Sequence, residues 1–212
     1  MSRLKRKEEE IQKLASLIAH EFRNSLAAIS GLIRTKPRRK NAINLIEKEC
    51  REMENLIKHI IDFTRPVKLS ISTINSNELL EDLISDFHLP QGIKFRKCLN
   101  PLRSEINGDW ELLTRVFSNI LKNAVEARPK EYITIVTKEE GPFIIIEISD
   151  DGIGISEENL KRVAEPFFSL KEGGIGLGLA FVRKIVSLHE GTFEIESKEK
   201  IGTTVRIKLP IK

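Results

Sequence analysis

The chain has 212 residues, of which 40% are hydrophobic, and its 35 basic and 31 acidic side chains give a formal net charge of +4. The two signs are interleaved and there is one Trp and one Tyr, so the sequence offers neither a basic patch nor a stacking platform, and we expect no nucleic-acid partner. Cys50 and Cys98 are isolated, which argues against a zinc site or a disulfide framework and indicates a reducing compartment.

Hydrophobic residues are spread along the chain without a long uninterrupted run. No stretch approaches about 18 consecutive apolar residues, the length of a membrane-spanning helix, and a charged segment follows Met1. We therefore expect no membrane contact by this chain, no secretory signal and a cytoplasmic location. A membrane anchor in a longer parent protein is compatible with this expectation.

The first third of the chain predicts two amphipathic helices joined by a short turn. Residues 4–35 contain no Pro, and apolar residues recur mostly at spacings of three and four, at Ile11, Leu14, Ile18, Phe22, Ile29 and Leu32. Pro37 breaks this helix, and a second helix, which Pro66 ends, carries Ile43, Ile46, Cys50, Met53, Ile57 and Ile60. The apolar seam of this hairpin packs either on the rest of the chain or, as we favour, on a second copy in a dimeric four-helix bundle.

After Pro66 the pattern changes to short alternating strands and helices. Helices are predicted over 75–87, 109–127 (with Asp109 as N-cap) and 176–188, a strand over 93–99, and β-hairpins at Gly141-Pro142 and at the end of the chain. Antiparallel pairs with helices between them indicate an α+β two-layer sandwich rather than a doubly wound sheet. We predict two domains, residues 1–68 and residues 69–212.

His20 lies in the middle of the first predicted helix, within HEFRNSL. Glu21 is adjacent and can orient the imidazole and accept a proton, and Asn24 at i+4 shares the face of His20. A neutral imidazole is a competent nucleophile toward a phosphoryl group that is held in line. A single His on a helix is more often an ordinary surface residue. The interpretation of His20 as a nucleophile therefore depends on Glu21 and Asn24.

Two polar segments suggest a site for a phosphorylated ligand. In SNILKNAVEA, Asn119 and Asn123 share one side of a helix, either as a buried hydrogen-bonded network or as a Mg²⁺ and phosphate site. In GGIGLGL, glycines open directly into a helix, and free N–H groups at a helix N-terminus bind anions such as a triphosphate. Between them, Asp150 in ISDDGIGI ends a strand before Gly152 and Gly154, which is either an acidic turn or part of the same site.

Taken in order, these segments resemble the motif set of sensor histidine kinases of two-component systems, and the resemblance covers nearly the whole chain. HEFRN is similar to the phosphoacceptor box, RVFSNILKNAVEA to the Asn box, SDDGIGI to the first glycine box, EPFFS to the Phe box and GGIGLGL to the second glycine box. The resemblance implies a dimerisation and phosphotransfer hairpin followed by a Bergerat-type ATP-binding domain. It also implies ATP and Mg²⁺ as cofactors.

The resemblance also assigns roles to single residues. His20 is the implied phosphoacceptor, Glu21 its acid/base partner, and Asn24 the residue that positions water for dephosphorylating a partner. The implied nucleotide-binding residues are Asn119, Asn123, Asp150, Gly152, Gly154, Lys171, Gly174, Gly176 and Gly178, with Thr203 or Thr204 at the adenine end. Among them, Asn123 ligates Mg²⁺, Asp150 accepts a hydrogen bond from the adenine amino group, and Lys171 with the three later glycines holds the phosphates.

The expected function is therefore autophosphorylation of His20 from ATP, transfer to an Asp of a response regulator receiver domain, and phosphatase activity toward that regulator. The sequence departs from the family pattern at Ser25, where the family usually has a Pro that kinks the first helix. Bending of this helix is therefore in doubt. The alternatives are an ATPase or scaffold of the gyrase and chaperone nucleotide fold, and a pseudokinase that acts only as an interaction module. The His-Glu-x-x-Asn helix argues against the first alternative, and the intact motif residues argue against the second.

Overall fold

The computed structural model describes residues 18–19, 22–34, 39–64, 67–99, 104–171, 174 and 176–212. His20, Glu21, Pro37 and Pro66 lie outside the described residues. The chain divides into one unit of Met1–Pro66 with Phe167–Leu177 and a second unit of Val67–Pro166 with Gly178–Lys212. The division falls two residues before the predicted boundary at residue 68, and the inclusion of Phe167–Leu177 in the first unit was not indicated by the sequence.

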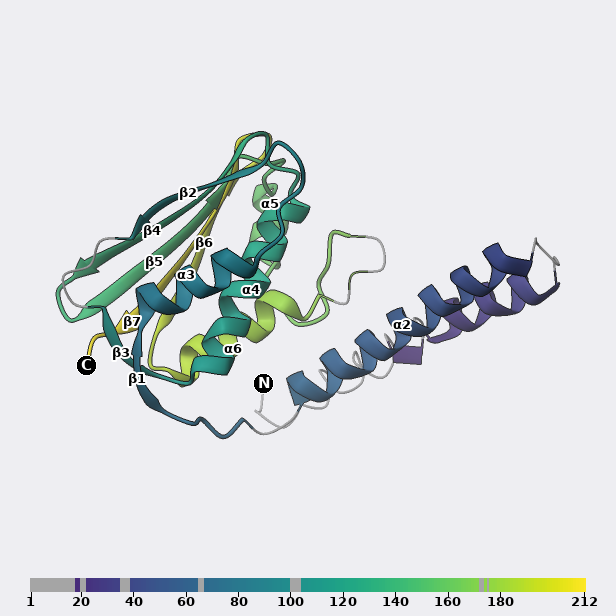
Figure 1. Cartoon of the computed structure of the whole chain (residues 1–212), viewed down its shortest axis with the longest axis horizontal. Helices are drawn as coiled ribbons and strands as arrows, with labels where there is room; N and C mark the ends of the chain where they lie inside the picture. Colours follow the sequence, from purple (N-terminus) through teal and green to yellow (C-terminus); the bar gives the residue numbers. More distant parts are fainter. Residues whose placement is uncertain are drawn as a thin grey trace. The chain divides into compact units, whose positions relative to one another are not determined.

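Two helices form the hairpin of the first unit (Figure 1). Residues 22–34 are helical, and α2 runs through Arg39–Thr64. Phe22, Ile29 and Ile46 of the predicted seam are half-buried, whereas other large apolar side chains are exposed, namely Leu26, Ile33, Ile43, Leu45, Ile57 and Ile61. Within the part of the chain that the structure describes, no helix combines the length and apolarity needed to cross a membrane.

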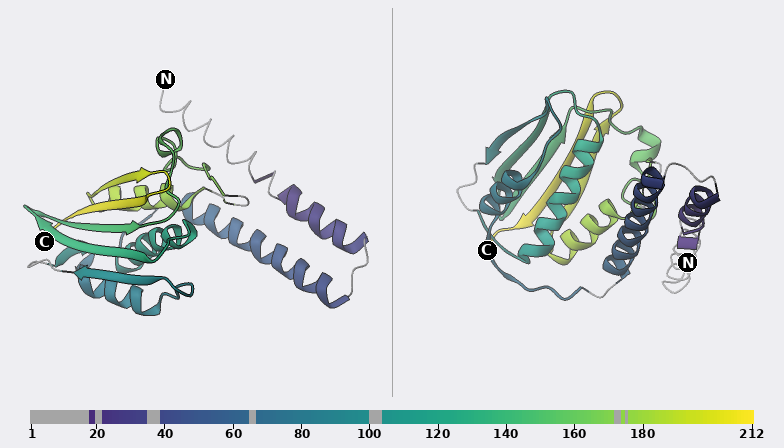
Figure 2. Two further views of the ribbon diagram at one scale, coloured as in Figure 1. Left: turned by 90° about the horizontal axis from the view of Figure 1, so that it is seen from above. Right: turned by 45° about the vertical axis from the view of Figure 1, so that its right-hand side comes forward.

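The second unit is a sheet covered on one face by helices, which confirms the predicted α+β two-layer class (Figures 1 and 2). The five-stranded sheet has the order β2-β4-β5-β7-β6. Its strands are β2 (Lys94–Leu99), β4 (Tyr132–Glu140), β5 (Phe143–Asp150), β6 (Thr192–Lys198) and β7 (Gly202–Pro210). The helices α3 (Ser76–Asp86), α4 (Trp110–Glu126) and α6 (Gly178–Leu188) form the second layer, and α5 (Glu157–Leu160) is a single short turn.

The strand pairing corrects two details of the sequence prediction. The hairpins β4–β5 and β6–β7 are antiparallel as expected, but β2 pairs in parallel with β4, because α4 lies in the connection between them and returns the chain to the same end of the sheet. A separate two-stranded sheet of β1 (Ser72–Asn75) and β3 (Glu105–Gly108) was not predicted. These strands of four residues are too short for a clear alternation signal.

The core lies between the sheet and the helix layer. Along the central strands every second side chain is buried toward the helices, including Ile133, Ile135, Ile144, Ile146, Ile148, Val205, Ile207 and Leu209. They pack in one cluster with Val116, Phe117, Ile120 and Leu121 of α4 and with Val182 and Ile185 of α6. The opposite face carries a group of paired charges: Glu147 accepts from Lys138 at 3.0 Å and from Arg206 at 2.7 Å. The alternation therefore fixes which face of each strand belongs to the helix side.

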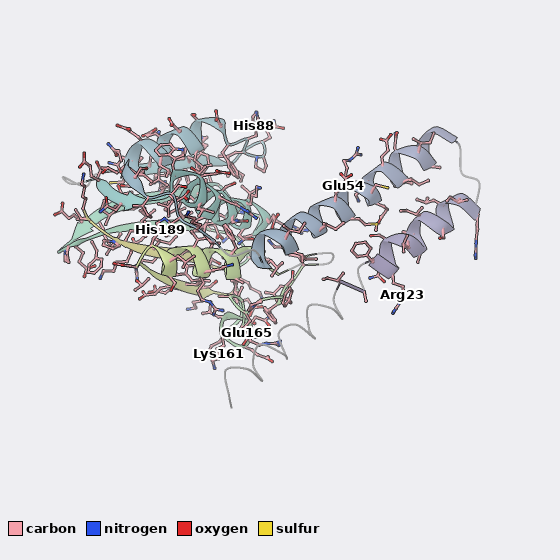
Figure 3. All side chains as sticks on the ribbon, turned by 90° about the horizontal axis from the view of Figure 1, so that it is seen from below. Arg23, Glu54, His88, Lys161, Glu165 and His189 are labelled. Carbon is pink, nitrogen blue, oxygen red and sulfur yellow. The ribbon has the colours of Figure 1, made fainter. Side chains whose placement is uncertain are left out.

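The start of α4 is fixed by a buried hydrogen-bond cluster around its N-cap, Asp109. The Asp109 carboxylate accepts from the N–H of Leu112 at 3.0 Å, as predicted for an N-cap, and from the N–H of Ser70 at 2.8 Å. The Asp109 N–H donates to Nε2 of buried His189 at 2.9 Å, while Nδ1 of His189 lies 2.8 Å from the carbonyl of Ile185 (Figure 3). Because Nε2 accepts, Nδ1 carries the ring hydrogen. The cluster holds the beginning of α4 against the end of α6.

Candidate functional site

Asp150 ends β5 and begins the loop that contains the first pair of predicted glycines. Its Oδ1 accepts from the N–H of Gly152 at 2.9 Å, and the backbone N–H of Thr203 on the neighbouring strand also donates to the carboxyl group. Burial raises the pKa of Asp150 from its usual 3.8 to about 6, because desolvation outweighs these two hydrogen bonds. A half-buried carboxylate with an elevated pKa at the end of a strand is a candidate ligand-binding group.

The loop after Asp150 is held at both sides by backbone contacts. Ile153 donates its N–H to the carbonyl of Ala127, at the end of α4, at 2.9 Å, and accepts from the N–H of Lys200 at 2.6 Å. A Cβ on Gly152 would overlap the carbonyl of Ala127, and a Cβ on Gly154, which has φ +66°, would overlap the carbonyl of Lys198. The glycines therefore let the loop pass between α4 and the β6–β7 turn, a reason that the sequence alone did not provide.

Asp151, the second carboxylate of the motif, has a separate structural task. Its Oδ1 accepts from the N–H of Lys130 at 2.7 Å, and its Oδ2 accepts from the N–H of Glu131 at 3.2 Å. These bonds tie the loop to the segment that enters β4. The adjacent acidic residues therefore differ in role, and only Asp150 belongs to the sheet end where the motif glycines lie.

The Asn face of α4 meets the start of α6. Nδ2 of Asn119 donates to the carbonyl of Arg115 at 2.9 Å, and a Cβ built on Gly178 would lie 3.6 Å from Oδ1 of Asn119. Asn123 is half-buried one turn further along the same side of α4. Both predicted carboxamides are therefore on the side of α4 that adjoins the N-terminus of α6, where backbone N–H groups are available to an anion.

The remaining glycine segment belongs to the other unit. Gly176 has φ +67°, and its carbonyl accepts from the N–H of Phe167 at 2.9 Å. The N–H of Lys171 donates to Oγ of Ser169 at 3.1 Å, and the N–H of Gly174 donates to the carbonyl of Lys171 at 3.1 Å. Because α6 starts at Gly178, two residues later than expected, Lys171, Gly174 and Gly176 form a loop of their own.

The strand register separates the two predicted threonines. Thr203 pairs with Asp150 across β5 and β7, and Thr204 pairs with Ser149. Side chains alternate along a strand, so Thr203 shares the face of Asp150, whereas Thr204 lies on the opposite face with its Oγ1 2.9 Å from Oγ of Ser149. Oγ of Ser197, which the sequence analysis did not single out, lies 2.9 Å from Oγ1 of Thr203 and accepts from the N–H of Ile155 at 2.8 Å.

The predicted phosphoacceptor region is described only in part. His20 and Glu21 lie outside the described residues. Asn24 is exposed on the helix of residues 22–34, and Ser25 beside it is half-buried. Arg23 on this helix and Glu54 on α2 are both visible in Figure 3. The structure thus gathers Asp150, Gly152, Gly154, Asn119, Asn123, Gly178 and Thr203 in one unit, and it places Asn24, Lys171, Gly174 and Gly176 in the other.

Two family models match the chain. Residues 10–67 match the His Kinase A (phospho-acceptor) domain, and residues 108–212 match the histidine kinase-, DNA gyrase B- and HSP90-like ATPase. Sporulation kinase C of Bacillus subtilis (strain 168) is 33% identical over 94% of this chain and 49% of the relative. Sensor histidine kinase ZraS of Escherichia coli (strain K12) is 31% identical over 98% of this chain and 48% of the relative.

A solved structure of histidine kinase ThkA in complex with response regulator protein TrrA shares the fold. It has a TM-score of 0.78 at 24% identity, over 99% of this chain and 64% of that chain. The chain spans about half the length of the curated relatives that it matches. With both domain models in the family's order, the chain belongs to the sensor histidine kinases of two-component systems, of which it comprises the phosphoacceptor and ATPase-type domains.

Proposed function

We propose that this chain is the catalytic core of an ATP-dependent protein-histidine kinase that phosphorylates its own His20. The observation that carries the proposal is the convergence of α4, the Asp150 loop and the start of α6 in one unit. The Asp150 loop is bonded to the end of α4 at Ala127, and Asn119 of the same helix lies next to Gly178. This arrangement places a carboxylate, two carboxamides and a helix N-terminus along one path, as a nucleotide requires.

In this proposal the adenine binds at Asp150 and the phosphates bind further along α4. The Asp150 carboxylate accepts a hydrogen bond from the adenine amino group, with Thr203 on the same face of the sheet and with Gly152 and Gly154 shaping the loop. Asn119 donates a hydrogen bond to the phosphates, and Asn123 ligates the Mg²⁺ that they bind. Gly178, at the start of α6, contributes backbone N–H groups to the phosphates. The proposed roles of Lys171, Gly174 and Gly176 as a cation and as N–H donors to the phosphates rest on their place in the sequence motif. We leave Thr204 out because its side chain lies on the opposite face.

Magnesium fits the donor chemistry of this region. The carboxamide oxygen of Asn123 is the hard oxygen ligand that Mg²⁺ accepts, and this ion normally completes its shell with phosphate oxygens and water. When bound, it would neutralise charge on the phosphates. The chain's own task is to hold the carboxamide at a fixed place on α4, which packing of Ala124 and Leu121 into the core achieves.

The chemical step is a phosphoryl transfer to an imidazole. One ring nitrogen of His20 attacks the γ-phosphorus, and the bond from this phosphorus to the β,γ-bridging oxygen breaks, so that ADP leaves with the electron pair. The proton on the other ring nitrogen passes to the carboxylate of Glu21. Atoms and charges balance without a further reactant. The roles of His20 and Glu21 rest on their place in the sequence motif.

The proposed partner is a response regulator, to which the phosphoryl group passes on an Asp of the receiver domain. The support is the family membership and the complex of ThkA with TrrA, a response regulator protein. In this proposal Asn24, which is exposed and follows His20 by four residues in the sequence, orients water for hydrolysis of the regulator's phosphoaspartate. Phosphatase activity toward the regulator is therefore part of the proposal.

We further propose that the hairpin pairs with a second copy of this chain. Leu26, Ile33, Ile43 and Ile61 are each at least half exposed, at 54%, 64%, 50% and 51%. Large apolar side chains left in water on one helical hairpin favour association into a four-helix bundle, because burial against a second hairpin removes them from solvent.

A product balance tests this function against the ATPase alternative. The chain is incubated with ATP and Mg²⁺, and ADP, inorganic phosphate and protein-bound phosphate are measured in the same samples. A kinase forms protein-bound phosphate in step with ADP until about one phosphate is bound per acceptor. ADP matched by inorganic phosphate throughout, without protein-bound phosphate, would instead support the ATPase reading.

Asp150→Asn is expected to weaken ADP binding at pH 7.5 by at least about tenfold, because a charge-assisted hydrogen bond to the base is lost. In the wild type, affinity should fall as the pH drops below about 6, where Asp150 becomes protonated. Titration calorimetry between pH 5 and pH 8 measures both effects. An affinity in the wild type that does not change across this range would contradict the role of the carboxylate.

The same substitution has an opposite expected effect on stability. Because the folded-state pKa of Asp150 lies above its usual 3.8, the folded form binds the proton more tightly, and stability is lost as pH rises from about 4 through about 6. Without nucleotide, Asp150→Asn should therefore stabilise the protein above pH 6 by about 1 kcal/mol, after allowance for partial solvent screening, and by little near pH 4. Urea unfolding at the two pH values measures the difference.

A further inference from the structure

The side of α4 that adjoins α6 carries a row of polar residues that starts near the Asp150 loop. The helix ends at this loop, where the carbonyl of Ala127 accepts from Ile153. Asn123, Asn119 and Arg115 then follow toward the start of the helix at intervals of four residues, about 6 Å of helix axis each. A nucleotide whose base lies at Asp150 and whose phosphates extend along α4 therefore reaches Arg115 last.

The guanidinium of Arg115 lies beside the first turn of α6. Its Cζ is 4.3 Å from the centroid of the Phe181 ring, and Phe181 is 4% exposed. Side chains on an α-helix lean toward its N-terminus, so the ring of Phe181 covers the turn that begins at Gly178. The half-buried Arg115 is thereby held at the same end of α6 as Asn119, whose side chain bonds to the Arg115 carbonyl at 2.9 Å.

We propose that Arg115 binds the terminal phosphate of ATP and is the residue by which this site distinguishes ATP from ADP. The inference rests on the proposed function, since it requires a nucleotide with its base at Asp150. A guanidinium keeps its charge at any physiological pH and binds phosphate oxygens through two parallel N–H groups. The contact with the Phe181 ring restricts the guanidinium group, so less conformational entropy is lost when the phosphate binds.

A purely structural role gives a different prediction for the same residue. If Arg115 serves only to cover Phe181, its loss lowers stability and affects ATP and ADP equally. If it binds the terminal phosphate, its loss affects only nucleotides that carry that phosphate. The ratio of the two affinities therefore separates the roles, whatever the change in stability.

The test is titration calorimetry with Mg²⁺ and either ADP or the non-hydrolysable analogue AMPPNP. Arg115→Met keeps an unbranched apolar chain over Phe181 and removes the charge, and Arg115→Lys keeps a charge without the bidentate group. Arg183→Met is the matched control, because Arg183 is exposed on α6 itself. Thermal unfolding of each variant checks that it folds.

We expect Arg115→Met to weaken AMPPNP binding at least about tenfold and ADP binding less than about twofold, with Arg115→Lys between it and the wild type. The control should change neither. An unchanged ratio of the two affinities in both Arg115 variants would overturn the inference and leave the proposed function standing. Failure of the wild type to bind either nucleotide would instead overturn the proposed function, and the inference with it. Should Arg115→Met not fold, the same ratio in Arg115→Lys decides.

Discussion

Replacing Asn123 by Ala is expected to lower the rate of autophosphorylation by at least about 100-fold, with little change in the fold. The side chain is half-buried on the side of α4 that adjoins the start of α6, and in the proposed site its oxygen is a ligand of Mg²⁺. Removing one preorganised group that acts on the charge of a transferring phosphoryl group typically costs a factor of 10² to 10³. The measurement is the initial rate of protein-bound phosphate formation at saturating ATP and Mg²⁺.

The control for this prediction is Asn107→Ala, because Asn107 is an exposed Asn on β3, outside the proposed site. It should phosphorylate at the wild-type rate. The Asn123 variant should also require more Mg²⁺ for half-maximal rate. A rate within threefold of the wild type would show that Asn123 is not a metal ligand, and the hydrogen-bonded network considered from the sequence would then be its role.

Replacing Gly202 by Ala is expected to destabilise the second unit by about 3 kcal/mol or more. Gly202 begins β7 with φ +145°, a conformation that residues with a side chain rarely adopt. An added Cβ would overlap the carbonyl oxygen of Asp150 and lie 3.1 Å from Cα of Asp151, so the backbone must move. Because Asp150 is the proposed adenine ligand, weaker ADP binding should accompany the loss of stability.

Gly141→Ala separates backbone strain from steric overlap. Gly141 also has a positive φ, of +60°, but nothing lies within 4 Å of a Cβ at that position. This variant should lose only about 1 kcal/mol, the usual cost of the left-handed conformation for a residue with a Cβ. Urea unfolding followed by circular dichroism measures both. Equal losses in the two variants would show that the contact with Asp150 contributes nothing.

Capping and turn residues predicted the helices and hairpins that begin or end beside them in the sequence. Helix α4 begins after Asp109 because this side chain caps it, and the β4–β5 hairpin turns at Gly141 and Pro142 as their turn preferences indicate. The parallel pairing of β2 with β4 was not predictable in the same way. The pairing depends on the edge of the sheet to which the connection through α4 brings the chain back. This cannot be predicted from any short stretch of sequence.

In the candidate site, the sequence showed which residues were of interest but did not show why those residue types are required. Asp150 and the glycines stood out in the sequence, yet Gly152 and Gly154 are required by the carbonyls of Ala127 and Lys198, which are distant in the chain. The choice of Thr203 over Thr204 needed the strand register. Arg115 is the first residue of the segment similar to the Asn box, but the sequence analysis assigned it no role, and it became a candidate through its place beside Phe181.

The most direct test of the central claim is the chemistry and location of the protein-bound phosphate. The chain and its His20→Gln variant are incubated with γ-labelled ATP and Mg²⁺, and the retained label is then treated with acid or with alkali. The account predicts label that is acid-labile and alkali-stable in the wild type and is absent from His20→Gln. Equal labelling of the variant, or consumption of ATP by the wild type without any retained label, would contradict it.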